Sequence, residues 1–176
     1  MSCPSGSYRV DIVGAIAASA FENCDSLVSV TIGPNVTSIG NRAFYSCNSL
    51  SSVTIGDSVT SIGSSAFYSC GSLSSVTIPD SVTSIGTGPF AACRSLTGIN
   101  VSVGNNAFCS EGGVLFNKDM STLVQFPGGV GGDYRIPDSV TSIGNYAFYD
   151  CESLSTVSIP DSVTSIGNYA FAYFRG

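Results

Sequence analysis

Apolar residues recur along this chain with a fixed step of 23 residues. Phenylalanine occupies one phase of the repeat, at Phe21, Phe44, Phe67 and Phe90, and again at Phe148 and Phe171. Leucine and isoleucine occupy two further phases, at Leu27, Leu50, Leu73 and Leu96 and at Ile39, Ile62 and Ile85. A single short unit cannot bury its apolar face alone, so these positions predict stacked units that share a continuous core.

The unit spanning residues 50–70 shows which elements the pattern predicts. Val53-Thr54-Ile55 is β-branched and alternates in polarity, which indicates a strand whose valine and isoleucine point inward. Gly56-Asp57-Ser58 has the chemistry of a turn. Residues 59–62 then form a second short extended piece.

The end of the unit, residues 66–70, predicts about one helical turn with Phe67 and Cys70 on the same face. The strands of all units are expected to pair in one parallel ladder. Their predicted positions are around residues 30–32, 53–55, 76–78, 99–101, 134–136 and 157–159.

The repeat is interrupted once, and the interruption predicts a β-hairpin. Two apolar runs, 114–116 and 122–126, flank the turn-forming triplet Asn117-Lys118-Asp119. We expect this hairpin to project from the stack. The chain is thus predicted to be one β-rich solenoid over residues 1–176, with repeats at about 8–101 and 134–176 and a non-repeat insert at about 102–133.

The amino-acid sequence of the repeat resembles that of a known family. Ile-Pro-Asp-Ser-Val-Thr-Ser-Ile-Gly-Asn-Tyr-Ala-Phe stands at 136–148 and again at 159–171. It resembles the BspA-like, or treponemal, leucine-rich repeat, and the hairpin at 113–127 resembles an insert that recurs in such proteins. The resemblance implies a leucine-rich-repeat solenoid, wound as a right-handed superhelix with 23-residue repeats. It also implies surface-exposed or secreted microbial proteins that adhere to host or matrix proteins, and it brings no catalytic residues.

Composition narrows the function further. Charged residues make up 10% of the chain and the formal charge is −6, with no basic run that would favour a nucleic-acid partner. Histidine is absent, which removes the commonest general base and zinc ligand. We therefore predict no enzyme activity, no cofactor and no metal site.

Export and membrane signals are also absent from the sequence. No uninterrupted apolar run reaches the length of a membrane span, so we predict no membrane insertion. Residues 12–21 have the hydrophobicity of a signal-peptide core, but Asp11 precedes them and they lie in register with the repeats. The compartment is left open, with a cell-surface or secreted location implied by the resemblance alone.

Five of the seven cysteines share one repeat phase, at Cys24, Cys47, Cys70, Cys93 and Cys151. Phe174 takes that phase in the last unit, which indicates an inward, apolar position and a column of buried, reduced thiols. Stacked parallel side chains seldom offer the geometry of a disulfide. Cys3 and Cys109 fall outside the phase, so one of them is a candidate for exposure.

Two polar columns have alternative interpretations. Asp57, Asp80, Asp138 and Asp161 share a phase, and Asn35 fills it in an early unit. These residues either gather Ca²⁺ or serve the turn by bonding to their own backbone, and the asparagine favours the turn. The outward Ser and Thr of the strands form two hydroxyl columns, which are typical of a solvated strand face or of an ice-binding solenoid.

Differences between units point to the contact surface. The strand face is nearly uniform Ser and Thr, whereas residues after the Ile-Gly turn and beside the cysteine vary from unit to unit. A surface adapted to one partner should vary, so we predict contacts from the insert and the variable turns. The candidate residues are Phe116, Asn117, Lys118, Asp119, Arg42, Arg94 and Tyr146.

The predicted function is a non-enzymatic module for protein–protein interaction or adhesion. A passive spacer in a longer surface protein and an ice-binding solenoid are the alternatives. No polar cap follows the last unit at Phe171, so we also expect either a longer natural molecule or end-to-end self-association.

Overall fold

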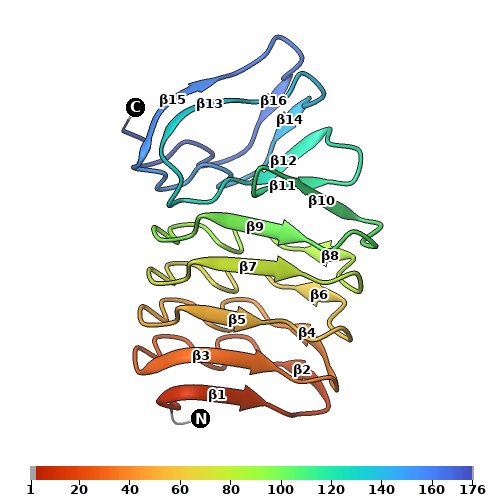
Figure 1. Cartoon of the computed structure of the whole chain (residues 1–176), viewed down its shortest axis with the longest axis vertical. Coiled ribbons are helices and arrows are strands. Elements are labelled where there is room, and N and C mark those ends of the chain that lie inside the picture. The colour runs from red at the N-terminus through yellow and green to blue at the C-terminus, as the bar shows by residue number, and fades with distance from the viewer. Residues whose placement is uncertain (1–2, 176) are drawn as a thin grey trace.

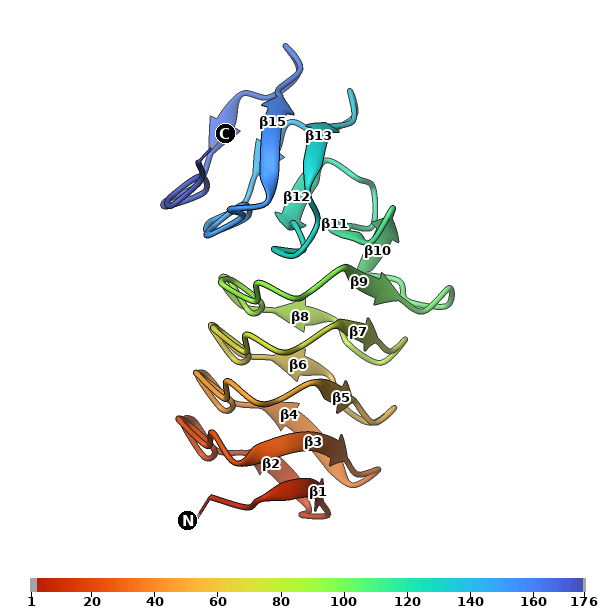
Figure 2. The same cartoon turned by 60° about the vertical axis from the view of Figure 1, so that its left-hand side comes forward.

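The computed structural model describes residues 3–175. The solenoid was predicted over residues 1–176, so Met1, Ser2 and Gly176 of that prediction lie outside the described residues. The chain winds into a β-solenoid: the rungs of residues 6–101 stack along one long axis, and the C-terminal rungs, residues 132–175, are turned steeply against that stack (Figures 1 and 2). One side carries β1 (Gly6–Val10), β3 (Leu27–Ile32), β5 (Ser52–Thr54), β7 (Ser75–Ile78), β9 (Gly98–Val101), β13 (Gly132–Arg135) and β15 (Leu154–Ser158). A second side carries β2 (Gly14–Ile16), β4 (Val36–Ile39), β6 (Ser61–Ile62), β8 (Ser84–Ile85), β14 (Ser142–Ile143) and β16 (Ser165–Ile166). The insert contributes β10 (Phe108–Glu111), β11 (Val114–Asn117) and β12 (Thr122–Gln125).

The strands pair in parallel and in the register that the 23-residue period predicts. In β3 and β5, Val30 lies opposite Val53 and Thr31 opposite Thr54, so apolar and polar side chains each continue their own column. The prediction of one unbroken ladder is wrong, because β1-β3-β5, β7-β9 and β13-β15 are separate hydrogen-bonded groups. The last break has a clear cause, since the insert lies between β9 and β13.

The helical turn predicted for residues 66–70 does not form. Ser65 and Ser69, four residues apart, both have positive φ values, of 53° and 57°. The residues at the same two repeat positions in the other complete units also have the left-handed backbone conformation. The amides alternate: Tyr68 N donates to Ser65 O within the rung, whereas Phe67 N donates to Pro89 O of the next rung. A helix would direct all its amides along its own segment, so bonding to the neighbouring rung replaces it here.

Phenylalanine rings form the axis of the core, as predicted. Phe67 is fully buried and stacks on Phe44 and Phe90, with ring centroids 5.1 and 5.5 Å apart. A second column joins Phe126, Phe148 and Phe171. The core is accordingly divided into two clusters, one formed mainly by residues 10–99 and one by residues 114–174.

The insert joins these two clusters, and the prediction that it projects from the stack is wrong. β12 pairs in parallel with β14, so it takes the place of a rung strand on the second side of the solenoid (Figure 1). In β11, Leu115 belongs to the first cluster and Phe116 to the second, and both side chains are fully buried. The run Val114-Leu115-Phe116 is apolar on both faces because both faces are covered.

Asn105 ends the regular stack before the insert. It occupies the core phase that Val82 occupies one unit earlier, and it is fully buried. Its Nδ2 donates to the carbonyls of Pro79 and Val82, while its Oδ1 accepts from the amides of Ala107 and Phe108. Every polar group of this side chain is therefore satisfied, and the chain is redirected into β10.

The column of buried thiols is confirmed for Cys47, Cys70, Cys93 and Cys151, which we call the column thiols. Cys47 Sγ donates to Phe21 O at 3.0 Å, and Cys70 and Cys93 make the same bond to the preceding rungs at 3.2 and 3.1 Å. Burial raises the pKa of Cys47 to about 11 and that of Cys93 to about 12. All four thiols are therefore neutral near pH 7.

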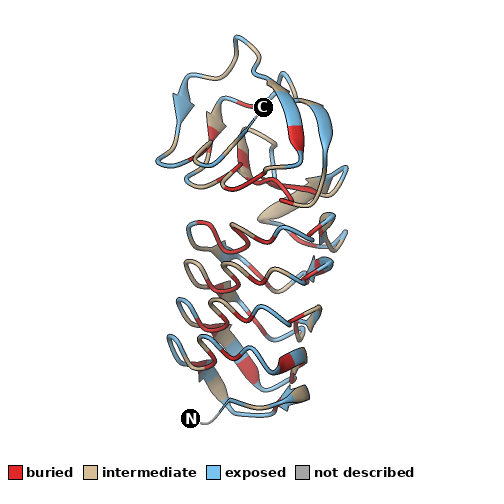
Figure 3. Cartoon of the chain, turned by 90° about the vertical axis from the view of Figure 1, so that its left-hand side faces the viewer, coloured by how far each residue is buried: buried red, intermediate tan, exposed pale blue. Residues whose placement is uncertain are grey.

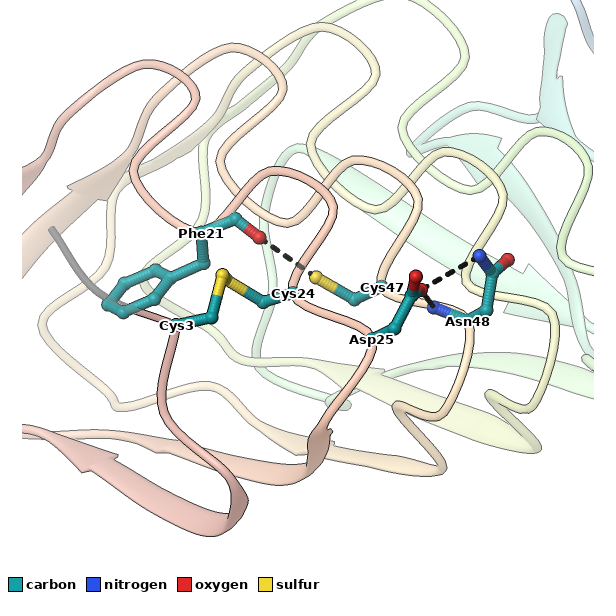
Figure 4. The surroundings of a disulfide bond; sticks show 6 residues. All are labelled: Cys3, Phe21, Cys24, Asp25, Cys47 and Asn48. Atoms are coloured by element: carbon teal, nitrogen blue, oxygen red, sulfur yellow. Dashed lines mark hydrogen bonds between the residues drawn. A yellow bond between two sulfur atoms is a disulfide. The ribbon is translucent and has the colours of Figure 1, made fainter.

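Cys24 departs from the expectation of a reduced thiol, because it forms a disulfide with Cys3 (Figure 4). Cys3 lies before β1 and is thus not part of the stacked column. It approaches Cys24 from outside the column, so the geometry of stacked parallel side chains does not limit this pair. The disulfide fastens the start of the chain over the first rung. Cys109, the other cysteine outside the repeat phase, is free and half-buried.

Candidate functional site

Six of the eight tyrosines gather on the side of the solenoid formed by the tight turns. Figure 3 faces this side, where the first four rungs meet the C-terminal rungs. Two adjacent hollows, of about 440 and 410 Å³, share Tyr68, Tyr149 and Tyr173 as their common wall. We call this surface the tyrosine groove, and its six tyrosines are Tyr45, Tyr68, Tyr146, Tyr149, Tyr169 and Tyr173.

The rings of the groove form one continuous series. Tyr45 stacks on Tyr68 with centroids 4.9 Å apart, and Tyr68 meets Tyr149 at 5.7 Å across the junction between the two groups of rungs. Tyr149 in turn contacts Tyr146 at 5.2 Å and Tyr173 at 5.3 Å. These distances lie in the range of favourable aromatic pairs, so the rings hold one another in place.

Small residues on the fourth rung make room for this junction. Ala91 stands at the phase where other units carry Tyr45, Tyr68 and Tyr149, and Gly88 stands at the phase of Tyr146. A Cβ on Gly88 would lie only 3.0 Å from the Tyr146 Cβ. The tight turn of the fourth rung therefore carries no ring of its own, and Tyr146 packs against Gly88.

Arg94 bridges the two groups of rungs. Its Nε and Nη2 donate to the two carboxylate oxygens of Asp150 at 2.7 and 2.9 Å, and Nη2 also reaches Glu152 at 3.4 Å. The Asp150 side chain is only 7% exposed, whereas that of Arg94 is 59% exposed. Such a bidentate pair fixes orientation as well as charge, so it fixes the width of the groove.

Arg42 lies at the other end of the groove. It forms an ion pair with Glu22, and its guanidinium carbon stands 3.9 Å from the centroid of the Tyr45 ring. The hydrogen bond with Arg42 lowers the pKa of Glu22, and the same bond raises the pKa of Arg42. Both groups therefore stay charged across the physiological range.

Tyr68 is the most perturbed phenol of the groove. Burial raises the pKa of its hydroxyl, and hydrogen bonding with the Tyr149 side chain raises it further. The hydroxyl is therefore a neutral hydrogen-bonding group rather than a phenolate. An ionised tyrosine nucleophile is not favoured at this position.

The predicted contact residues separate into two sets. Arg42 and Tyr146 line one hollow of the groove and Arg94 lines the other, so the structure brings these three together. The four residues of the insert, Phe116, Asn117, Lys118 and Asp119, line neither hollow. Asp150 was not among the predicted contacts, and its phase is occupied by Asn, Ser, Ala or Tyr in other units.

Within the insert, the prediction for Phe116 as a surface contact is wrong, because its ring is fully buried. Asn117 and Asp119 hold the hairpin turn: Asn117 Oδ1 accepts from Thr122 N, and Asp119 Oδ1 accepts from Ser121 N. Lys118 Nζ donates to Asn105 O at 2.6 Å. These polar groups have structural partners, although Lys118 and Asp119 are exposed.

The two polar columns do not form a larger site. Asp57, Asp80, Asp138 and Asp161 are all exposed, and the described part of the chain contains no group of three or more acidic, cysteine or histidine side chains able to hold a metal ion. Along the strand face, Ser75 lies opposite Gly98 and Thr77 opposite Asn100. The hydroxyl array is therefore interrupted at β9, and Thr156 and Ser158 of β15 lie opposite Asp133 and Arg135 rather than other hydroxyl residues.

The repeat, the ladders and the core columns agree with a known family model. The model of the BspA-type leucine-rich repeat region matches residues 12–120 and 132–175, in six copies. The chain belongs to this family. The unmatched residues between the two ranges fall within the predicted insert.

Solved structures with this type of repeat share the fold. The chain is 28% identical to the pneumococcal vaccine antigen PcpA, with a TM-score of 0.84 over 91% of this chain and 40% of that one. It is 36% identical to a leucine-rich cell surface protein of Faecalibacterium prausnitzii, with a TM-score of 0.78 over 88% of this chain and 41% of that one. A leucine-rich repeat protein of Eubacterium ventriosum is 24% identical, with a TM-score of 0.59 over 97% of this chain and 59% of that one.

This chain therefore spans less than two thirds of the length of each of these three proteins. None of the curated proteins compared with it matches. From residue 3 to residue 175, no helix is long and apolar enough to cross a membrane.

Proposed function

We propose that this chain is a protein-binding module of adhesion type, that it is non-enzymatic, and that the tyrosine groove is its contact surface. The observation that carries this proposal is the gathering of six tyrosines and two arginines at one junction. Tyrosine and arginine are the residue types over-represented at the energetic centre of protein interfaces. Arg42, Arg94 and Tyr146, which stand at phases whose residue type varies among the units, belong to this set.

The relatives support the same class of function and its place in the cell. One is described as a vaccine antigen and another as a cell surface protein, which fits a module displayed outside a microbial cell. We extend that location to this chain, with a host or matrix protein as the partner. Nucleic acid is a poor candidate partner, because the chain carries a formal charge of −6.

A binding screen with paired variants tests the proposal. Immobilised serum and extracellular-matrix proteins are probed with the chain, with the double variant Tyr169→Ala, Tyr173→Ala and with the control Tyr8→Ala. Tyr169 and Tyr173 are 62% and 67% exposed, so their removal leaves the core intact, and Tyr8 is an exposed tyrosine outside the groove. Binding that the double variant loses and the control keeps supports the groove.

Two other outcomes redirect the assignment. Binding that survives the double variant but is lost in Lys118→Ala moves the contact surface to the insert, where Asn117, Lys118 and Asp119 remain a prediction. No binding to any member of the panel would favour the passive spacer.

A further inference from the structure

We infer that the Cys3–Cys24 disulfide is a redox-controlled lock on the first rung, residues 3–24. Its reduction opens this rung alone and separates Glu22 from Arg42, at one end of the tyrosine groove. The link to the groove rests on the proposed function, because it regulates the same surface. The lock itself follows from the way the rung is held, from the accessibility of the disulfide and from the neighbouring thiols.

The two ends of the solenoid differ in how far their core positions are covered. Ile16 of the first rung is 2% exposed, whereas Ile166, at the same repeat position of the last rung, is 54% exposed. In the first rung Tyr8 also packs on Phe21, with ring centroids 5.7 Å apart. The first rung thus closes its end of the core, so its opening would expose the second rung.

Hydrogen bonds hold the first rung to one neighbour only. The amides of Ser19, Phe21 and Asn23 donate to carbonyls of the second rung at 2.9, 2.7 and 2.8 Å. Inner rungs have a neighbour on both sides, and in a solenoid each unit is stabilised mainly by its neighbours. The disulfide adds a covalent link between residues 21 positions apart, which through loop-closure entropy lowers the open fraction of the rung by about a hundredfold.

The disulfide has one accessible end, because Cys3 is exposed and Cys24 is buried. A thiolate of a dithiol reductant attacks Cys3 Sγ, and Cys24 leaves with the electron pair of the S–S bond and takes up a proton. The second thiol of the reductant then displaces Cys3. The dithiol ends as a disulfide, and Cys3 and Cys24 end as thiols.

The neighbouring thiols leave this exchange undisturbed. Cys47 Sγ is directed to Phe21 O, to which it donates at 3.0 Å (Figure 4). Burial raises the pKa of Cys47 to about 11, so it is not a thiolate near pH 7 and does not attack Cys24. After reduction Cys24 is a thiol at the repeat position of the column thiols, where the fold already accommodates such groups. The lock therefore has two defined and reversible states.

Opening of the first rung changes the charge at one end of the tyrosine groove. Glu22 lies in the first rung and Arg42 in the second, and their ion pair joins the two. When the rung opens, Glu22 moves away, while the Arg42 guanidinium stays beside the Tyr45 ring, 3.9 Å from its centroid. This end of the groove is thus neutral in oxidising surroundings, such as the outside of a cell, and positively charged in reducing ones.

Hydrogen exchange of the intact chain tests the lock in three samples: the oxidised parent, the parent in dithiothreitol, and the variant Cys3→Ser. The column thiols and Cys109 are already free, so dithiothreitol changes one bond among the described residues. We expect the amides of Ser19, Phe21 and Asn23 to exchange about a hundredfold faster in both samples without the disulfide, and those of β7 and β9 to be unaffected. The control Cys109→Ser should exchange as the oxidised parent does.

Titration of the Glu22 carboxyl group by NMR tests the link to the groove. Hydrogen bonding with Arg42 lowers the pKa of Glu22 in the closed state. After reduction this pKa should rise to the ordinary value for glutamate, because the carboxylate has lost the guanidinium.

Four results would overturn these claims. Equal protection of the first rung with and without the disulfide would remove the lock, as would the absence of a Cys3–Cys24 peptide from a digest of the oxidised protein. Faster exchange along the whole chain would show that the rung does not open alone. An unchanged pKa of Glu22 would remove the link to the groove. No partner is present in these measurements, so failure of the lock leaves the tyrosine groove as the contact surface, and failure of the groove in the protein screen leaves the lock.

Discussion

Truncating one ring in the middle of the phenylalanine column should destabilise the solenoid strongly. Phe67 is fully buried and stacks on a ring above and a ring below. Replacement of a buried phenylalanine by alanine costs about 3–5 kcal/mol, through the lost transfer free energy and the cavity that remains. Each aromatic pair contributes roughly a further 0.5–1.5 kcal/mol, so Phe67→Ala should fall in the upper half of that range.

The last ring of the second column provides a matched control. Phe171 is only partly buried and stacks on Phe148 alone, apart from an edge contact with Phe174. Since hydrophobic stabilisation scales with the area removed from water, Phe171→Ala should cost about half as much as Phe67→Ala. The comparison thus isolates the effect of having neighbouring rungs on both sides.

Urea unfolding followed by far-ultraviolet circular dichroism measures both losses, and the absence of tryptophan makes this signal preferable to fluorescence. The midpoint should shift much further for Phe67→Ala than for Phe171→Ala. A loss below about 1 kcal/mol for Phe67→Ala would show that the column is not the core. Equal losses for the two variants would show that stacking on both sides adds nothing.

Four further predictions concern the thiols, the insert and the last rung. In the native protein only Cys109 should react rapidly with a thiol reagent, and rapid labelling of the column thiols would contradict their burial. Their raised pKa values, to about 11 for Cys47, mean that the thiols' contribution to the unfolding free energy is constant below about pH 8.5 and falls toward pH 11, because the unfolded thiols ionise first; a urea midpoint unchanged between pH 7.5 and 10 would refute this. Deleting 114–126 should disrupt the fold, contrary to what a projecting hairpin predicts, and an unchanged circular dichroism spectrum would show that β11 and β12 are dispensable. Ile159 and Ile166, 45% and 54% exposed on the last rung, should promote self-association at micromolar concentration, and sedimentation as a clean monomer would contradict this.

The columns of the fold could be predicted from the sequence because a 23-residue step repeats one local environment in every unit. Val53, Phe67 and Cys70 each have counterparts in other units, so inward and outward positions follow from counting. The left-handed residues could not be predicted in this way. Ser65 and Ser69 are not residue types that demand positive φ, and their conformation is imposed by amide bonding to the neighbouring rung.

The role of the insert was misjudged although a signal was present. Turn chemistry at Asn117-Lys118-Asp119 indicated a hairpin correctly, but three consecutive apolar residues at 114–116 are more typical of a strand covered on both faces. The groove also depends on small residues, which a search of the sequence for charged or aromatic contact residues does not identify. From the sequence alone, Gly88 and Ala91 cannot be distinguished from ordinary variation between units; in the structure, Tyr146 packs against Gly88.

The insert also matters for how the chain finds its fold. Rungs of one length and nearly one sequence are interchangeable, so a folding chain could pair each strand one whole unit too early and still bury every apolar column. Repeat proteins are prone to such misassembly. β11 fits at one place only, because it divides its side chains between two cores, with Leu115 in the first cluster and Phe116 in the second. A strand paired one unit out of step would leave one of these side chains without its cluster, so the insert marks the single alignment in which both clusters are closed.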